Sequence, residues 1–179
     1  MNRIILPILT LGLSLSLLCP GWAAAPNPEQ ARALAEIVRL GGKLTFDEKS
    51  PEKPVVGVDL SGPQTGSKVT DADLECLAGM TSIQSLDISL NKVSDGGLKC
   101  LTGLTNLESL NLMGTTVTDA SLERLKGLTN LRSLDLRGTN ATDMGMEHLR
   151  QFARLRSLYL GAKVTDAGLL HLKLSLIHI

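Results

Sequence analysis

One short pattern returns along most of the chain at a nearly constant interval of 24 residues. It contains an aspartate that follows threonine or serine, and successive copies of this aspartate are 24, 24, 24 and 23 residues apart. Leucine or isoleucine recurs at the same interval in several columns. The aspartates are Asp71, Asp95, Asp119, Asp143 and Asp166, and two of the columns are Leu86, Leu110, Leu134, Leu158 and Ile88, Leu112, Leu136, Leu160. Such an interval is typical of a solenoid, in which each unit packs against its two neighbours.

Each unit contains the periodicities of two different elements. In SLDLR, residues 133–137, apolar residues alternate, which predicts a short strand with Leu134 and Leu136 on one face. In TDMGMEHLRQF, residues 142–152, apolar residues are three apart, which predicts a helix. We expect the Thr142 hydroxyl to cap this helix and Asp143 to interact favourably with the helix dipole. The recurring Thr-Asp pair is therefore interpreted as structural.

The pattern Leu-x-x-Leu-x-Leu-x-x-(Asn/Thr)-x-x-Val-(Thr/Ser)-Asp-x-x-Leu-x-x-Leu resembles a leucine-rich repeat. Two examples are LTNLESLNLMGTTVTDASLERL and LTNLRSLDLRGTNATDMGMEHL, and the resemblance covers about five repeats in residues 55–173. The pattern is most similar to the cysteine-containing subclass, of an exported bacterial type. The resemblance implies an α/β solenoid with parallel strands on its concave face and helices on its convex face. Where the family often has Asn or Cys, the chain has Asn91, Thr115 and Thr139, which we expect to satisfy backbone groups in the loops.

The first residues have the anatomy of a secretory signal peptide, which we assign to residues 1–23. Arg3 supplies the positive charge, residues 4–18 the apolar stretch, and residues 21–23 a small-x-small cleavage site. The apolar stretch has 15 residues, short of the roughly 20 that span a bilayer, and Cys19 lacks the small preceding residue of a lipoprotein signal. We therefore expect an extracytoplasmic protein, periplasmic or secreted, with no membrane association beyond the signal peptide.

Two segments that do not match the pattern flank the repeats. Residues 27–54 begin with a capping box and an apolar helical face, followed by strand-like stretches, which predicts an N-terminal cap of helix and strand. Residues 174–179 leave the repeat register, and we interpret them as an artefactual tail. On this hypothesis the sequence is a fragment that ends within a repeat.

The composition argues against several classes of function. Eighteen basic and 18 acidic residues give no net charge, and aromatic residues make up 2% of the chain, so we do not expect nucleic-acid binding. His148 and His171 lack a third ligand for a metal ion. Cys76 and Cys100 are expected to stay free thiols, because neighbouring helices pack ~8–10 Å apart and a disulfide needs closer Cα atoms.

The segment GPQTGSK, residues 62–68, lacks the Gly-Lys-Ser/Thr order of a phosphate-binding loop. We interpret it as an insertion in the first repeat. No catalytic set of side chains can be placed on the repeats, so we expect neither an enzyme nor a bound cofactor.

Side chains between the core leucines of the strands are expected to point out of the concave face in three rows. The middle row is Asp59, Asp87, Asn111, Asp135 and Tyr159, and the rows beside it are Ser85, Ser109, Ser133, Ser157 and Ser61, Ser89, Met113, Arg137, Gly161. The carboxylates favour a basic or polar partner, and tyrosine, arginine and methionine are favoured in protein interfaces. We predict that a monomer binds a protein partner through Asp87, Asn111, Met113, Asp135, Arg137 and Tyr159. The alternative is a structural spacer of a larger cell-envelope protein whose activity lies in a further C-terminal part.

Overall fold

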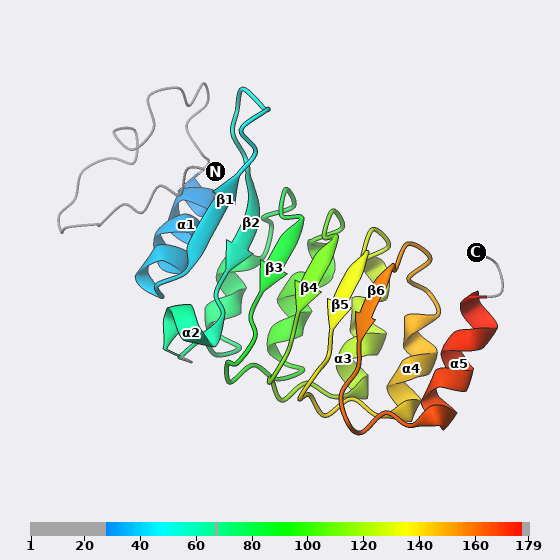
Figure 1. Cartoon of the computed structure of the whole chain (residues 1–179). Coiled ribbons are helices and arrows are strands. Elements are labelled where there is room, and N and C mark those ends of the chain that lie inside the picture. The colour runs from blue at the N-terminus through cyan, green and yellow to red at the C-terminus, as the bar shows by residue number, and fades with distance from the viewer. Residues whose placement is uncertain (1–27, 67, 177–179) are drawn as a thin grey trace.

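The computed structural model describes residues 28–66 and 68–176. Its central element is a six-stranded sheet whose strands follow one another in sequence order (Figure 1). The strands are β1 (Lys43–Phe46), β2 (Val55–Asp59), β3 (Ser85–Asp87), β4 (Ser109–Asn111), β5 (Ser133–Asp135) and β6 (Ser157–Tyr159). β1 pairs antiparallel with β2, and the other neighbours are parallel. The proposed signal peptide and residues 177–179 of the proposed tail lie outside the described residues.

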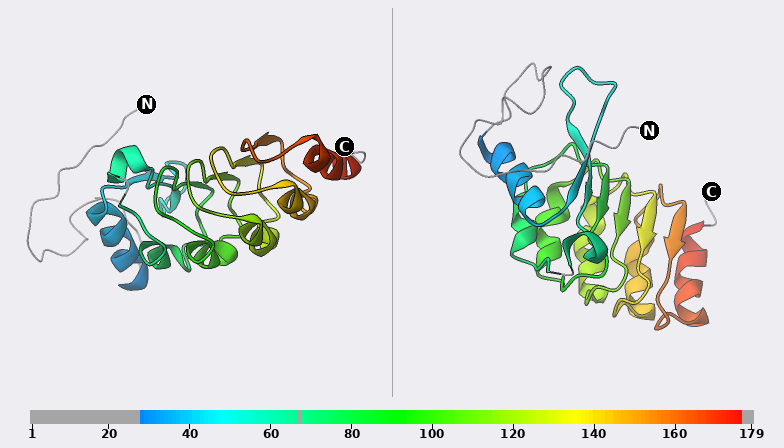
Figure 2. Two further views of the ribbon diagram at one scale, coloured as in Figure 1. Left: turned by 90° about the horizontal axis from the view of Figure 1, so that it is seen from below. Right: turned by 60° about the vertical axis from the view of Figure 1, so that its left-hand side comes forward.

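Except for α2, the helical elements form a row along the outer side of the curved sheet, with α1 before the first strand and the others after the strands of the repeats (Figure 2). They are α1 (Pro28–Arg39), α2 (Gly62–Thr65), η2 (Asp73–Leu77), η3 (Gly97–Gly103), α3 (Asp119–Arg124), η4 (Leu125–Gly127), α4 (Asp143–Leu149) and α5 (Asp166–Leu176). The short helix α2 lies in the segment interpreted as an insertion. The chain is thus the α/β solenoid that the repeat predicts, with strands on the concave face and helices on the convex face. None of the described helices is long and apolar enough to cross a bilayer.

The leucine columns form the core between sheet and helices. Leu110 and Leu134, neighbours in the sheet, are 1% and 0% exposed, and Met146 on α4 is also fully buried. Of the apolar face predicted for residues 142–152, Met146 and Leu149 lie on α4 and are buried, whereas α4 ends at Leu149 and the buried Phe152 follows the helix. Burial in one continuous cluster that runs from α1 to α4 explains why the units must stack to fold.

The polar residues at the strand exits bond the loop backbone as predicted. The Asn91 side-chain amide donates to the carbonyl oxygen of Leu60 at 2.7 Å and to that of Ser89 at 3.0 Å. The hydroxyls of Thr115 and Thr139 donate to carbonyls three residues earlier, at 2.6 and 2.7 Å. Throughout the described part of the chain, every buried side-chain nitrogen or oxygen atom has a hydrogen-bond partner.

The convex elements of the first two repeats differ from the predicted α-helix, because η2 and η3 are 3-10 helices. Gly96 and Gly97 lie at the start of η3, and glycine weakens a helix through its backbone entropy. At η2, the Thr70 hydroxyl donates to Asp73 at 2.7 Å and caps no backbone N–H. In α4, by contrast, the Thr142 hydroxyl accepts from the N–H of Met144 at 3.3 Å, so the predicted cap is confirmed there.

The aspartate of the repeated pattern connects each unit to the next, a role that the sequence analysis did not anticipate. Asp95 accepts from the backbone N–H of Thr118 at 2.8 Å, from its hydroxyl at 2.7 Å, and from the hydroxyl of Ser121. The same pair of bonds joins Asp71 to Ser94, Asp119 to Thr142 and Asp143 to Thr165. We call Asp71, Asp95, Asp119 and Asp143 the aspartate ladder. It fixes the register of adjacent units with bonds to a charged acceptor, which are stronger than neutral ones.

The segment before the repeats packs over the first of them. α1 buries Ala33, Leu34 and Ile37 and contacts η2, while β1 pairs with β2 (Figure 1). The close approach of β1 also accounts for Gly57, because a Cβ atom there would lie 3.0 Å from Thr45 Cβ. At the other end, α5 continues to Leu176, so residues 174–176 extend a helix although they leave the repeat register.

Candidate functional site

The parallel register brings the middle row of the concave face into line. Asp59, Asp87, Asn111, Asp135 and Tyr159 occupy paired positions on β2 to β6. Two of the predicted site residues, Met113 and Arg137, follow two positions later in the outer row. All six predicted residues therefore lie on one face, over β3 to β6. Their role in binding stays a prediction.

The middle row also has a structural role in the sheet. The side-chain oxygen of each Asp or Asn accepts from the backbone N–H two residues later, as in an Asx turn. The bonds run from Ser61 to Asp59 at 3.0 Å, Ser89 to Asp87 at 2.9 Å, Met113 to Asn111 at 3.1 Å, and Arg137 to Asp135 at 3.0 Å. Asn111 additionally donates its amide to Asp87 at 2.9 Å. The carboxylates and the amide of the middle row therefore use part of their hydrogen-bonding capacity in the turns at the strand ends.

Tyr159 interrupts this series, because a phenol cannot make an Asx turn. Its side chain is free of that role and the residue is 49% exposed. The guanidinium of Arg137 lies 5.0 Å from the centre of the Tyr159 ring, which is a cation–π contact. Tyr159 thus presents an aromatic surface at the C-terminal end of the row.

Asp135 holds Arg137 in place over Tyr159. Arg137 Nη2 lies 2.6 Å from Asp135 Oδ2, and Nε lies 3.0 Å from both carboxylate oxygens. The Asp135 side chain is 10% exposed, whereas that of Arg137 is 55% exposed. The hydrogen bonds that Arg137 donates to Asp135, together with the negative charge of Asp135, raise the pKa of Arg137. A buried carboxylate therefore orients an exposed guanidinium, and the three side chains form a pre-organised cluster on the concave face.

A shallow hollow lies at the N-terminal end of the same face. It has a volume of about 420 Å³ and its lining includes Asp59, Asp87, Thr45 and Gln84. Strand β1 forms one of its sides through Thr45. The two carboxylates make this end of the concave face acidic.

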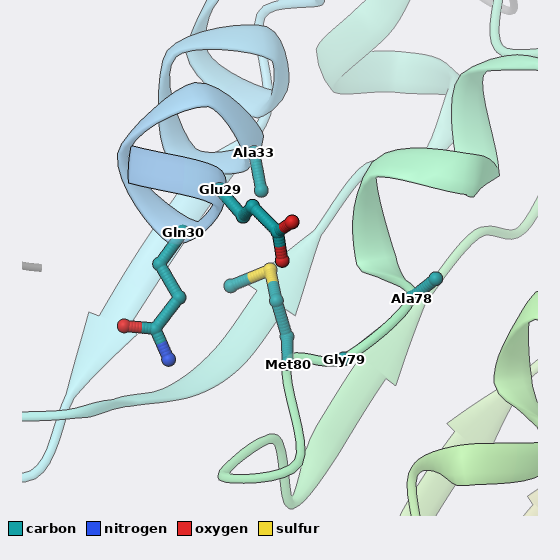
Figure 3. Close-up of a pocket in the computed structure, with 6 residues that line it drawn as sticks. All are labelled: Glu29, Gln30, Ala33, Ala78, Gly79 and Met80. Atoms are coloured by element: carbon teal, nitrogen blue, oxygen red, sulfur yellow. The ribbon is translucent and has the colours of Figure 1, made fainter. Parts of the chain in front are cut away.

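A second pocket, between α1 and the turn after η2, is too small for a ligand. Its volume is about 40 Å³, enough for about one water molecule. Figure 3 shows Met80 extending from the turn toward Glu29 and Ala33 of α1, so side chains occupy the space between the two elements. We assign no function to this pocket.

The cysteines and histidines of the convex side form no recognisable site. Cys76 and Cys100 are free thiols. Burial raises the pKa of Cys76 to about 11, and burial also raises that of Cys100. A raised pKa disfavours the reactive thiolate at neutral pH. Residues 28–66 and 68–176 contain no group of three or more side chains arranged to hold a metal ion.

The sequence analysis missed Leu90 at the edge of the concave face. Its φ of 56° lies in the left-handed region, where the equivalent residues of the next two repeats are Gly114 and Gly138. Leu90 is 42% exposed and lies over Gly114, where a Cβ atom would come within 2.6 Å of Leu90 Cδ2. A leucine in a column of glycines was the signal available in the sequence. Backbone strain of this kind often occurs at functional sites.

An alanine variant is usually more stable than a glycine variant at the same position, and we expect the reverse order of stability at Leu90. We expect the free energy of unfolding of L90G to be about 1 kcal/mol higher than that of L90A, because glycine lacks the Cβ atom that makes the left-handed conformation unfavourable. Urea denaturation of both variants measures the difference. Equal stabilities, or a more stable L90A, would contradict the left-handed conformation of this residue.

Comparisons with known proteins agree with this architecture. The leucine-rich-repeat family matches residues 79–101 and 103–126. An internalin (inlF) from Listeria monocytogenes is 31% identical, with a TM-score of 0.51, over 59% of this chain and 30% of that chain. The chain thus spans less than a third of that internalin. A search of curated proteins found no match.

Two further solved structures are more distant. Leiomodin-1 actin-binding site 2 is 16% identical, with a TM-score of 0.55, over 80% of this chain and 86% of that chain. A second internalin (inlC2) from Listeria monocytogenes is 19% identical, with a TM-score of 0.44, over 78% of this chain and 66% of that chain. At this identity the leiomodin match concerns the fold alone. The family match, the first internalin and the observed sheet together show that the described residues have the fold of an α/β leucine-rich-repeat solenoid.

Proposed function

We propose that this chain is an exported protein-binding module that contacts its partner with the concave face, around Tyr159 and Arg137. Solenoids of this type present an extended concave surface for binding. We further propose that the protein is a monomer and that its repeats belong to the cysteine-containing subclass. Its location is extracytoplasmic, and residues 27–54 form its N-terminal cap. Export rests on the signal-like composition of residues 1–23.

The observation that carries the proposal is the cluster of Tyr159, Arg137 and Asp135. Interface hot spots are enriched in tyrosine and arginine. Here the arginine is held by a nearly buried carboxylate and stacked on the tyrosine, so little side-chain entropy remains to be lost when a partner binds. Tyr159 is also the one member of the middle row that takes no part in an Asx turn.

The N-terminal end of the concave face, opposite the Tyr159 cluster, favours contact with basic or polar groups of the partner. The hollow lined by Asp59 and Asp87 lies there, at the N-terminal end of the face. Both carboxylates use one oxygen for a turn. We propose Met113, Asn111 and Leu90 as the intervening contact surface.

Tyr159→Ala and Arg137→Ala test the proposal most directly. Each is expected to weaken capture of the partner at least tenfold, which corresponds to about 1.4 kcal/mol. The chain is immobilised, exposed to an extract of the organism that makes it, and the captured proteins are quantified for each variant by mass spectrometry.

Glu147→Ala is the matched control, because Glu147 is an exposed residue of the convex helix α4. The proposal requires that this variant capture as much partner as the unmodified chain. Equal capture by all variants would refute the concave site. No specific capture by the unmodified chain would favour the alternative, a structural spacer of a larger cell-envelope protein, in which the row serves only the turns.

A further inference from the structure

A row of residues borders the concave face where the strands of the repeats begin, and its charge changes sign along the solenoid. Backbone bonds align the row, because the N–H of each member donates to the carbonyl oxygen of the member in the preceding repeat, at 2.8, 2.7 and 2.8 Å. We call these residues the entry row: Gln84, Glu108, Arg132 and Arg156. The first half of the row is thus neutral or acidic, and the second half is basic.

The hollow at the N-terminal end of the concave face continues the acidic half, because its lining includes Gln84 together with Asp59 and Asp87. Asp59 uses Oδ1 to accept the N–H of Ser61, and within the described residues nothing donates to its Oδ2. Lys43 lies opposite Asp59 on β1, but it takes part in none of the ion pairs between described residues. The hollow therefore contains a carboxylate oxygen that no cation of the described chain binds.

The basic half of the entry row places two arginines on neighbouring strands. Arg132 and Arg156 directly precede Ser133 and Ser157, which are paired in β5 and β6, and both arginines are exposed. Like charges at neighbouring positions destabilise a sheet. Glu108 offsets this only weakly, because its ion pair with Arg132 is 3.4 Å long and the two side chains are 46% and 40% exposed. A carboxylate of a ligand would relieve the repulsion, and it is the group that guanidinium binds best.

A row of serines connects the acidic end to the basic end. Its members are aligned on β3 to β6, and the first of them lines the hollow; they are Ser85, Ser109, Ser133 and Ser157. None of their hydroxyls bonds to another described residue. Because serine is small and its hydroxyl both donates and accepts, a ligand chain can approach the sheet along this row and form hydrogen bonds with it.

The separation of the two ends sets the spacing of the charged groups that a ligand must present. The hollow lies over β2 and β3, and the two arginines precede β5 and β6 (Figure 1). Three strand intervals of ~4.8 Å give about 14 Å, which an extended chain covers with about four residues, and side chains four positions apart point to the same side. An α-helix is about 10 Å wide, so the entry row and the middle row would hold it away from the serines.

We propose that the concave face binds an extended segment of its protein partner in which a lysine or arginine and an aspartate or glutamate are about four residues apart. The basic side chain enters the hollow beside Asp59 and Asp87, the acidic side chain contacts Arg132 and Arg156, and the intervening backbone crosses the serine row. This inference rests on the proposed function and adds the chemistry of the partner to it. Charge complementarity at both ends carries it, because a segment of one charge sign would be attracted at one end and repelled at the other.

The test selects ligands for the full chain from a displayed library of random linear peptides. We expect the enriched peptides to contain a basic and an acidic residue at the proposed spacing about tenfold more often than the unselected library. One enriched peptide then serves as the probe, and fluorescence anisotropy gives its dissociation constant for each variant of the chain.

Double-mutant cycles assign the two ends of the probe. Asp59→Asn removes the charge but keeps an acceptor for the turn, as Asn111 does at the equivalent position of β4. In Asp59→Asn, alanine at the basic position of the probe should cost about threefold less affinity than in the unmodified chain. The same reduction is expected in Arg156→Gln for alanine at the acidic position. Glu147→Gln on the convex helix α4 is the control and should leave the dissociation constant unchanged.

Coupling at both ends is the result that the inference requires. If the probe loses affinity in Tyr159→Ala but shows no coupling to Asp59 or Arg156, the inference is overturned and the concave site of the proposed function stands. If no peptide is enriched, an isolated segment is not recognised, which also overturns the inference, while capture from the extract still tests the concave site. A probe without coupling that binds Tyr159→Ala as tightly as the unmodified chain would contradict both proposals.

Discussion

Leu134→Ala is expected to lower the free energy of unfolding by about 3–4 kcal/mol. Leu134 is fully buried in β5, between the strands of the preceding and following repeats. Truncation of such a leucine loses its transfer free energy and leaves a cavity that the neighbouring repeats can fill only in part. Because a domain of this size is stable by only about 5–15 kcal/mol, the loss should appear as a large shift in the midpoint of urea denaturation.

The same substitution in the last repeat provides the matched control. Leu158 pairs with Leu134 across β5 and β6 but is only partly buried. We expect Leu158→Ala to cost less than half as much, about 1–1.5 kcal/mol, because part of that side chain is already in water. If the two substitutions cost the same, the burial gradient along the solenoid would be wrong.

Asp95→Ala should lower the free energy of unfolding by about 2–4 kcal/mol, although its side chain belongs to no hydrophobic core. The substitution removes the acceptor of the Thr118 N–H, the Thr118 hydroxyl and the Ser121 hydroxyl. Ser121 is fully buried, and a buried donor left without a partner costs more than the bond itself contributed. Denaturant unfolding measures the loss, and Asp166→Ala, which removes a carboxylate with no described partner, should change stability by less than about 0.5 kcal/mol.

The pH dependence of stability provides an independent reading of Asp95. Burial raises its pKa, but the hydrogen bonds from Ser121 and Thr118 outweigh burial and hold the pKa below the ordinary 3.8. A carboxyl group with a lowered pKa in the folded state stabilises the fold above its ordinary pKa, and this contribution is lost as the pH falls through the folded value. Stability should therefore decline below about pH 4, and less steeply in Asp95→Ala. If stability declined equally below pH 4 in both proteins, the hydrogen bonds of Asp95 would be excluded as a cause of the acid destabilisation.

The repeat interval was sufficient to predict the architecture of the fold. The alternation around Leu134 and the three-residue spacing of Met146 and Leu149 each predict one element, and five copies at a nearly constant interval predict that the units stack. The capping role of Thr142 was also visible locally, because an N-cap bonds backbone groups within its own helix.

Contacts between units could not be derived in the same way. Asp95 accepts hydrogen bonds from Thr118, which lies in the following unit. The sequence pattern is equally compatible with a purely local role of this aspartate at the start of a helix. The left-handed φ of Leu90 can be expected only from a comparison of the repeats, in which its column otherwise contains Gly114 and Gly138. The antiparallel pairing of β1 depends on the neighbouring strand β2 and has no local signature.

The sequence was sufficient to predict where the candidate site lies, but not which of its side chains have a structural role and which are left exposed. Alternation alone places Asp135, Arg137 and Tyr159 on the concave face. That Asp135 holds Arg137 and completes a turn, while Tyr159 is left exposed, follows from distances within the sheet.

The stacking of units in register is tested most directly by NMR scalar coupling across backbone hydrogen bonds. The structure predicts couplings from the amide of Ile88 to the carbonyl of Asn111, from Leu112 to Asp135 and from Leu136 to Tyr159, each at the same position of successive repeats. Couplings at a shifted register, or rapid exchange of all three amides with no coupling detected, would contradict the solenoid and with it the concave surface proposed for binding.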